Sequence, residues 1–267
     1  MNGTVTAALE SIGLLGPGLG NWPQSRAVLR CETVYSPQAT LIPAPTTLPA
    51  AERRRTGRVV HLALAAGQEA TAGSGADLTA LATVFASSGA DSDNCHEILQ
   101  TLASADRLLS PTRFHNSVHN VTGGYWSIAT HDRAPYTVVC AYDGSFAAGL
   151  LETLSQVATS ANDVLLVAYD VDYPTPLREK RPLGAAFAVA LLLRPRAGPR
   201  SIGMLAASYS TAPADTLVNA ELEALRLSAP AARALPLLEH VAAGRPGTSA
   251  LEYQDSGSLL VEYLPCG

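Results

Sequence analysis

The sequence predicts an α/β fold in which strands and helices alternate along the chain. Residues 164–170 (VLLVAYD) form a short, almost wholly apolar run, which is typical of a central strand buried on both faces. Residues 145–159 instead place apolar side chains at helical spacing: Phe146, Leu150, Leu154 and Val157. This alternation favours a sheet with mainly parallel pairing.

The remaining elements follow from the same two periodicities. A short strand and turn are expected within residues 1–20, and a mostly extended, proline-rich loop over residues 21–50. Further strands are expected at 81–87, 136–141, 202–209 and 258–264, and a buried strand or strand–helix element at 183–193. Helices are expected at 57–72, 94–102 (capped by Asp93), from about Asn116, at 216–227 and at 231–243 (ended by Gly244).

Composition limits the classes of function. The chain has 267 residues, which is enough to bury a sizeable core, and 47% of them are hydrophobic while only 15% are charged. The formal net charge of −5 argues against nucleic acid as the main ligand, because phosphate binding needs a basic excess.

The cysteines and the apolar runs bear on location. Cys31, Cys95, Cys140 and Cys266 form no CxxC pair and read as free thiols. The N-terminal residues lack the basic start of a signal peptide, and the most apolar run, 183–193, is too short to span a bilayer. We therefore expect a soluble, cytoplasmic protein without a membrane span.

The stretch 110–145 is the best candidate for a site. Its strand over 136–141 runs into a sharp turn and a helix, where many enzymes expose a nucleophile at a helix N-terminus. Cys140 is a candidate, but three residues separate it from Gly144 at the turn. We expect Cys140 to be a small side chain buried in the strand, and Asp143 to occupy the turn and cap the helix.

Three other motifs are candidate ligand sites. His115 and His119 are four residues apart, as on one face of a metal-binding helix, but two ligands alone do not make a zinc site. Residues 16–20 (GPGLG) resemble a phosphate loop without the Lys-Ser/Thr that should follow. Arginines 53–55 form either a solvated loop or a contact with a subunit or carrier protein. Neither a metal nor a cofactor is expected.

The central stretch resembles the β-ketoacyl-acyl carrier protein synthases, which have the thiolase fold. The shared features align without a gap: Asn120, Gly123-Gly124, Ala134-Pro135 and the strand YTVVCAY. Further blocks that resemble the family are RRRTGRVVHLALAAGQEA, TVFASSG, VLLVAYD and PLGAAFAVALLL. The resemblance implies a largely complete first half over residues 1–212. Residues 213–267 would form a truncated second half within the same globular unit.

The departures from the family concern its chemistry. The alignment puts Asp143 at the position of the family's catalytic cysteine. Catalytic members also use two histidines of the second half, where this chain has His240 within a predicted helix and neither histidine motif. Condensation needs a thiolate to hold the acyl chain and histidines to stabilise the developing charge. The resemblance therefore implies the fold without a catalytic residue.

The pattern SPTRFHNSVHN…GYWSIA…SFAAGLLE resembles shortened ketoacyl synthase-like proteins of the chain-length-factor type, from aryl-polyene-like type II systems. This resemblance implies a heterodimer with a full-length ketosynthase, and contact with acyl carrier protein only indirectly. Such a subunit would not be catalytic; it would stabilise the ketosynthase and shape its acyl channel during polyene, polyketide or fatty-acid-type elongation. The residues implied at the interface or channel are Arg113, Phe114, His115, Asn116, His119, Asn120 and Tyr142.

Two alternatives remain open. The chain could be a stand-alone acyltransferase or condensing enzyme that uses Cys140 or Asp143. It could also be a scaffold that binds acyl carrier protein through the arginines at 53–55.

Overall fold

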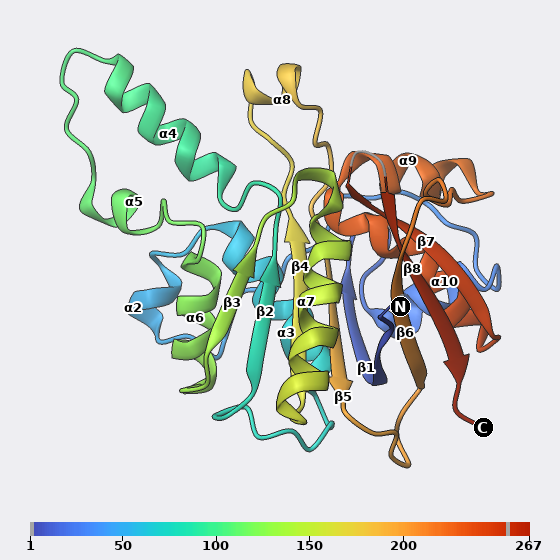
Figure 1. Cartoon of the computed structure of the whole chain (residues 1–267). Helices are drawn as coiled ribbons and strands as arrows, with labels where there is room; N and C mark the ends of the chain where they lie inside the picture. Colours follow the sequence, from blue (N-terminus) through green and yellow to red (C-terminus); the bar gives the residue numbers. More distant parts are fainter. Residues whose placement is uncertain (1–2, 255–256) are drawn as a thin grey trace.

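One sheet organises the molecule (Figure 1). Within the residues that the computed structural model describes, 3–254 and 257–267, it has eight strands in the order β3-β2-β4-β5-β1-β6-β8-β7. The strands are β1 (Val5–Leu15), β2 (Ala82–Ala86), β3 (Tyr136–Val139), β4 (Val164–Asp170), β5 (Phe187–Arg194), β6 (Gly203–Ser210), β7 (Gly247–Gln254) and β8 (Gly257–Pro265).

Helices cover both faces of this sheet, with α7 on one face and α3 on the other (Figure 1). The α-helices are α1 (Trp22–Leu29), α2 (Ala50–Arg53), α3 (Arg58–Thr71), α4 (Ser92–Ala103), α5 (Pro111–His115), α6 (Val121–Thr130), α7 (Ser145–Ser160), α8 (Leu177–Lys180), α9 (Ala220–Ser228) and α10 (Leu235–Ala243). Two 3₁₀ turns are η1 (Tyr142–Gly144) and η2 (Pro230–Ala234). None of the helices in the described ranges is long and apolar enough to cross a membrane.

The α/β class is confirmed, but the prediction of mainly parallel pairing is wrong. Among the described strands, β2 pairs in parallel with β3 and β4, while the other five pairings are antiparallel. Parallel neighbours need a long crossover, usually a helix, and antiparallel neighbours do not. Between β4 and β5 the chain forms only the four-residue helix α8, so β5 returns antiparallel to β4.

Most elements lie where the sequence predicts them, with four corrections. The loop predicted over 21–50 contains α1, and residues 231–243 divide into η2 and α10. The strand β7 was not predicted. The helix expected from about Asn116 is instead two helices, α5 before this residue and α6 after it.

Side-chain caps set the starts of α1 and α4. The Asn21 side chain accepts a hydrogen bond from the Gln24 N–H, and proline lies in the first turn, two strong helix-start signals. The Asp91 side chain accepts from the Asn94 N–H at the start of α4. The prediction that Asp93 is this cap is therefore wrong, because the helix begins earlier than its apolar residues indicate.

The central strands are buried on both faces, as the run at 164–170 predicts. On β4, Leu166 points into the core beneath α7 and Leu165 into the core beneath α3, so successive side chains serve opposite layers. On β5, Ala188 and Ala190 face α3. These small side chains allow α3 to pack close to the sheet.

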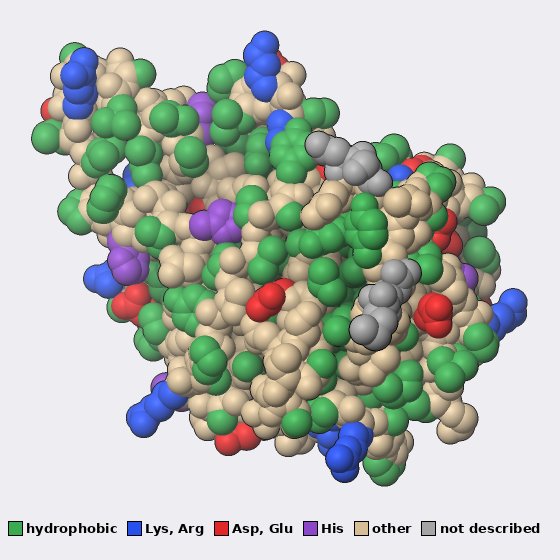
Figure 2. All heavy atoms as spheres, in the orientation of Figure 1, with side chains coloured by type: hydrophobic (Ala, Val, Ile, Leu, Met, Phe, Trp, Pro, Cys, Tyr) green, Lys and Arg blue, Asp and Glu red, His purple; other side chains and the backbone are tan. Residues whose placement is uncertain are grey.

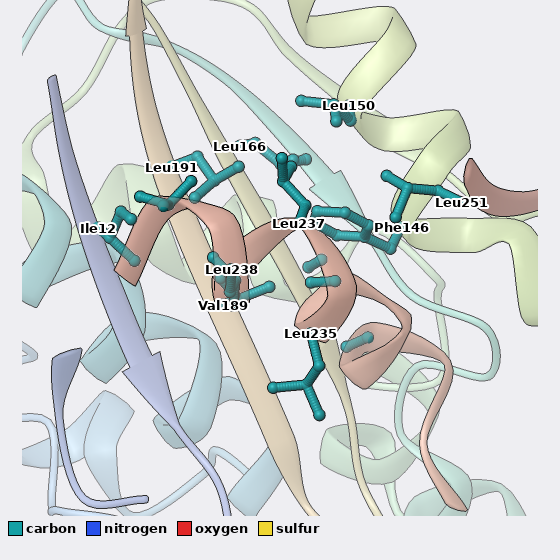
Figure 3. Close-up of a cluster of buried hydrophobic side chains, with 14 of the residues drawn as sticks. Ile12, Phe146, Leu150, Leu166, Val189, Leu191, Leu235, Leu237, Leu238 and Leu251 are labelled. Atoms are coloured by element: carbon teal, nitrogen blue, oxygen red, sulfur yellow. The ribbon is translucent and has the colours of Figure 1, made fainter. Parts of the chain in front are cut away.

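The core beneath α7 includes side chains from the C-terminal part of the chain (Figure 3). Phe146 and Leu150 of α7 lie near Leu166 of β4 and Leu237 of α10, and all four are at most 1% exposed. Residues far apart in sequence thus share one core. This packing positions the start of α7, and with it the turn that follows β3.

Candidate functional site

The carboxyl ends of β2, β3 and β4 meet at one edge of the sheet, because these strands are parallel. In α/β sheets this edge is where ligands and reactive groups usually lie. The chain there presents Ser87 and Ser88 after β2, the turn 140–144 after β3, and Asp170 at the end of β4. We take these residues and the side chains that contact them as the candidate site.

Tyr142 lies at the sharpest point of the turn. Its φ angle is +52°, a left-handed conformation that is uncommon for a non-glycine residue and marks a strained turn. The Ser145 hydroxyl braces the turn by donating to the Tyr142 carbonyl (2.7 Å) and accepting from the Ala141 N–H (3.1 Å). Gly144 is required because a Cβ there would overlap the carbonyl oxygen of Tyr253 in β7.

Asp143 lies in the same turn but does not cap α7. Gly144 is the N-cap residue of that helix and no side chain caps it. The Asp143 carboxylate instead accepts a hydrogen bond from the Arg181 guanidinium at 2.9 Å. A second arginine, Arg233, lies 3.8 Å from the other carboxylate oxygen. The prediction of a capping role is wrong because these two arginines, distant in sequence, bind the carboxylate in place of the helix N–H groups.

Arg181 makes three contacts at the turn. Its Nη2 donates to Asp143 and to the Ser88 hydroxyl (2.6 Å), and its guanidinium carbon lies 3.4 Å from the centre of the Tyr142 ring. Burial lowers the pKa of Arg181, but Asp143 and Tyr142 outweigh it and raise the pKa overall. A guanidinium has donors and no acceptor, so it cannot take a proton from a nucleophile.

An ionic network continues from Asp143 into the protein. Arg233 also contacts Glu252 at 3.2 Å, Glu252 lies 4.0 Å from Arg226, and Arg226 contacts Glu223 at 2.6 Å. Arg226 and Arg233 are only 5% and 8% exposed. Burial of such charges is costly unless they are paired. The network therefore holds Asp143 as a paired carboxylate rather than a free nucleophile.

Asp170, at the end of β4, is a buried carboxyl, 2% exposed. It accepts hydrogen bonds from the Ser88 N–H and the Ala231 N–H, both at 2.8 Å. Burial raises its pKa from 3.8 to about 7, although these hydrogen bonds oppose the shift. Asp170 thereby connects the ends of β2 and β4 to η2.

Cys140 lies just beyond β3 and is exposed, so the expectation of a buried strand residue is wrong. The strand ends at Val139, two residues earlier than predicted, because β2 ends at Ala86 and offers no further partner. The Cys140 Sγ donates to the Ser88 carbonyl at 3.3 Å.

The residues implied at a subunit interface divide into exposed and structural groups. Phe114 is 67% exposed at the end of α5, His115 beside it is exposed, and Arg113 pairs with Glu97 at 3.3 Å. Asn116 is instead buried: its amide donates to the Arg55 carbonyl at 2.6 Å and accepts from the Tyr125 hydroxyl at 3.3 Å.

His119 and Asn120 lie in the segment between α5 and α6. His115 is the last residue of α5, so the two histidines do not share one helix face. Burial lowers the pKa of His119, an effect that the main chain of Ser87 partly opposes. Asn120 is exposed, and its amide donates to the Tyr136 hydroxyl at 3.3 Å. In the described part of the chain no group of three His, Cys, Asp or Glu side chains is placed to hold a metal ion.

Two open grooves flank these residues. One, of about 640 Å³, runs along the turn and is lined by residues 141–144, 211–214 and 252–254 and by Gly257. The other, of about 530 Å³, is lined by Arg54 and Arg55 among other residues of mixed charge. Because Asp91, Asp93 and Glu97 line the same groove, the arginines do not form an isolated basic patch.

Three side chains that surround the turn were not predicted from the sequence: Arg181, Arg233 and Glu252. Each lies in a loop, a 3₁₀ turn or an unpredicted strand, far along the chain from Asp143. A single charged residue in such a segment is ordinarily solvated, so the sequence carries no local signal of their convergence.

The fold and the turn can now be compared with known proteins. The family model "Beta-ketoacyl synthase, N-terminal domain" matches residues 22–249, so the chain belongs to this family. The resemblance found in the sequence is confirmed. No curated protein sequence matches the chain.

Solved structures similar to this chain include components of ketosynthase complexes. One is from the complex of the ketosynthase ApeO with its chain length factor ApeC from Xenorhabdus doucetiae (TM-score 0.73, 24% identity, 97% of this chain and 99% of that chain covered). Another is from the AntDE:AntF complex of a type II polyketide acyl carrier protein with its ketosynthase (0.76, 11%, 100% and 100%). A third is from the ishigamide ketosynthase/chain length factor (0.70, 12%, 98% and 100%). These likenesses establish the thiolase-like fold.

Proposed function

We propose that this chain is a non-catalytic, chain-length-factor-like subunit that pairs with a full-length β-ketoacyl-acyl carrier protein synthase. In this role it stabilises the ketosynthase and helps to shape the channel that holds the growing acyl chain. The chemistry is that of polyketide, polyene or fatty-acid-type elongation, including the aryl-polyene type. The observation that carries the proposal is an open edge strand, β3, leading directly into a turn whose carboxylate is neutralised by arginines.

The turn supports the non-catalytic part of the proposal. Tyr142 and Asp143 occupy it, and the groups that contact Asp143 are guanidinium groups, which cannot act as a general base. A nucleophile needs a base or a depressed pKa to be activated. We therefore assign the chemistry to the partner and propose that Asp143 takes the place of the family's nucleophile.

The edge strand supports the pairing. In the described residues β3 is hydrogen-bonded to β2 alone, so its outer N–H and C=O groups are available. An open edge is a ready template for another chain. The arm of residues 92–116, here called the α4–α5 arm, projects from the same side of the molecule (Figure 1). It carries exposed apolar side chains that a partner would cover: Leu99, Leu102, Leu108 and Phe114.

The size of the matched chains is further support. In the three structures named above, the match covers 97% or more of this chain and 99% or more of its counterpart, so those counterparts are of about the same length. A ketosynthase chain from Burkholderia phymatum STM815 is covered over only 70% of its length. Two of the three structures are of a ketosynthase together with a chain length factor.

Co-expression with the ketosynthase encoded beside this chain tests the proposal. With a tag on the ketosynthase, we expect the two chains to co-purify in equal amounts as a heterodimer. The proposal fails if this chain purifies as a stable monomer, or as a homodimer, and never associates with the ketosynthase. Trapping of an acyl group on Cys140 in the isolated chain, detected by mass spectrometry, would instead support the stand-alone acyltransferase.

A matched pair of variants locates the interface. The Val139 carbonyl accepts from the N–H of Ser87, the residue after β2, so the alternate residue, Val138, directs its N–H to the open edge. Val138→Pro removes that donor while keeping the hydrogen bonds to β2, and we expect capture by the ketosynthase to fall about tenfold or more. Val138→Ala keeps the donor and should bind as the wild type does. Equal binding of both variants would exclude β3 from the interface.

A further inference from the structure

A second projection rises from the sheet edge that holds the turn. The segment 174–182, here called the α8 arm, leaves the end of β4, carries α8 at its tip and returns to β5 (Figure 1). Main-chain hydrogen bonds close its base, from Tyr173 N–H to the Leu183 carbonyl (3.0 Å) and from Gly184 N–H to the Ser228 carbonyl (3.0 Å). Beyond this base, α8 is one turn of helix and buries none of its residues.

Arg181 is the residue of the α8 arm that reaches back to the body of the protein. Its side chain is 15% exposed although the arm around it is exposed. It joins two other segments: Ser88, after β2, accepts from it at 2.6 Å, and Asp143, after β3, accepts from it at 2.9 Å. One guanidinium thus ties the α8 arm to the ends of two strands.

The same guanidinium lies over the ring of Tyr142. The distance from its carbon to the ring centre is 3.4 Å, while the residue as a whole remains 65% exposed. Planar guanidinium groups stack on aromatic faces, which lysine does not do in the same way. One face of the ring is therefore held in place, and the side chain still presents apolar surface to the outside.

The position of this stacked pair gives it a role. Tyr142 is the third residue after Val139, the last residue of the open edge strand. The α8 arm and the α4–α5 arm both project beyond the carboxyl ends of the parallel strands. Figure 2 shows the two projections with a hollow between them. A rigid aromatic ring at the end of β3 lies beside the surface on which the partner would dock.

We infer that Arg181 is a positioning residue that fixes the Tyr142 ring and the α8 arm as one rigid wall, and that this wall limits the length of the acyl chain growing in the partner. The inference rests on the proposed function and assigns a length-determining residue to it. Asp143 contributes by holding the guanidinium from the turn, while Tyr142 contributes the surface that the chain meets.

Hydrogen exchange of the isolated chain, followed by mass spectrometry, tests the positioning. Arg181→Gln removes the positive charge, its hydrogen bonds to Ser88 and Asp143, and the guanidinium over the Tyr142 ring. Exchange of the amides in the α8 arm should become about tenfold faster, because these contacts no longer hold the arm to the body of the protein. Arg178→Gln is the matched control: it makes the same charge change in an exposed residue of the same arm. Arg181→Lys keeps the charge without the planar stack and should fall between the two.

Product length in the reconstituted pair tests the role. With the ketosynthase and carrier protein supplied, Arg181→Gln and Tyr142→Ala should each shift the products by at least one extension unit toward longer chains. Arg178→Gln should give wild-type products, because the wall is intact in this variant. A residue that only supported the fold would lower the yield without changing the length.

The outcomes separate this inference from the proposed function. Wild-type products from an intact heterodimer containing Arg181→Gln overturn the inference and leave the proposed function standing. Unchanged exchange in the α8 arm of Arg181→Gln overturns the positioning role in the same way. Failure of the wild-type chain to bind the ketosynthase overturns the proposed function, and the length-limiting wall with it.

Discussion

Asp170 makes the stability of this protein depend on pH in a direction opposite to that of most carboxyl groups. The perturbation is Asp170→Asn, which removes the titration and nearly preserves the shape. In the folded protein burial raises the pKa of Asp170 to about 7, above its ordinary value of 3.8. The folded state therefore binds the proton more tightly than the unfolded chain does. The stabilisation is present at low pH and is lost as the pH rises toward 7.

The magnitude follows from the two pKa values. A raise of about 3 units corresponds to about 4 kcal/mol, at about 1.4 kcal/mol for each unit. Most of it falls in an accessible range: from about pH 5 to about pH 8, this group alone should lower the free energy of unfolding of the wild type by about 3 kcal/mol. The Asn variant loses a hydrogen bond to Ser88 or Ala231 at every pH, which offsets its curve without adding a slope.

Urea unfolding at several pH values measures the effect. The difference in unfolding free energy between the wild type and Asp170→Asn should change by about 3 kcal/mol across that range. Asp106→Asn, at an exposed site, is the matched control and should parallel the wild type. Parallel curves for the wild type and Asp170→Asn would refute the reasoning, since they would mean that Asp170 has an ordinary pKa in the folded protein.

Three further predictions concern the fold around the turn. Gly144→Ala should destabilise the protein by about 1–3 kcal/mol or more in urea unfolding, because the new Cβ would overlap the Tyr253 carbonyl; Gly124→Ala, where nothing lies within 4 Å, should be neutral or stabilising. Phe146→Ala should cost about 3–5 kcal/mol, because Phe146 is fully buried, and a cost below about 1 kcal/mol would contradict the packing. Asn116→Ala should cost about 1–3 kcal/mol by removing a buried amide that bonds two segments; a neutral effect on the melting temperature would argue that these bonds are replaced by water.

The strand–turn–helix at the site was predictable, but the conformation and surroundings of the residues in its turn were not. The run at 136–141, the glycine at 144 and the apolar spacing of 145–159 are local signals, and β3, η1 and α7 follow them, although β3 ends at Val139. The conformation of Tyr142 and the exposure of Cys140 depend on where β2 stops pairing and on the close approach of β7. Neither of these is encoded in neighbouring residues.

The pairing of the sheet shows the same division. The apolar run of β4 determined that this strand is central, because a strand buried on both faces must be apolar along its length. Its direction relative to β5 was decided by the connection between them, which holds one short helix instead of a crossover. The sequence pattern alone therefore overestimated parallel pairing.

The sequence by itself determined the α/β class, the family, and the strand–turn–helix unit of β3, the turn and α7, because these depend on local periodicity and on motifs along the chain. Only the tertiary structure decided which side chains surround Asp143 in that turn. Arg181 and Arg233 reach Asp143 from two separate segments, and Glu252 pairs with Arg233 from a third. Burial of Arg233 makes its pairing with these carboxylates obligatory. Charge pairing across such separations depends on folded geometry. The turn therefore resembles a nucleophile-bearing turn in sequence, whereas in the structure its carboxylate, Asp143, is ion-paired with two arginines.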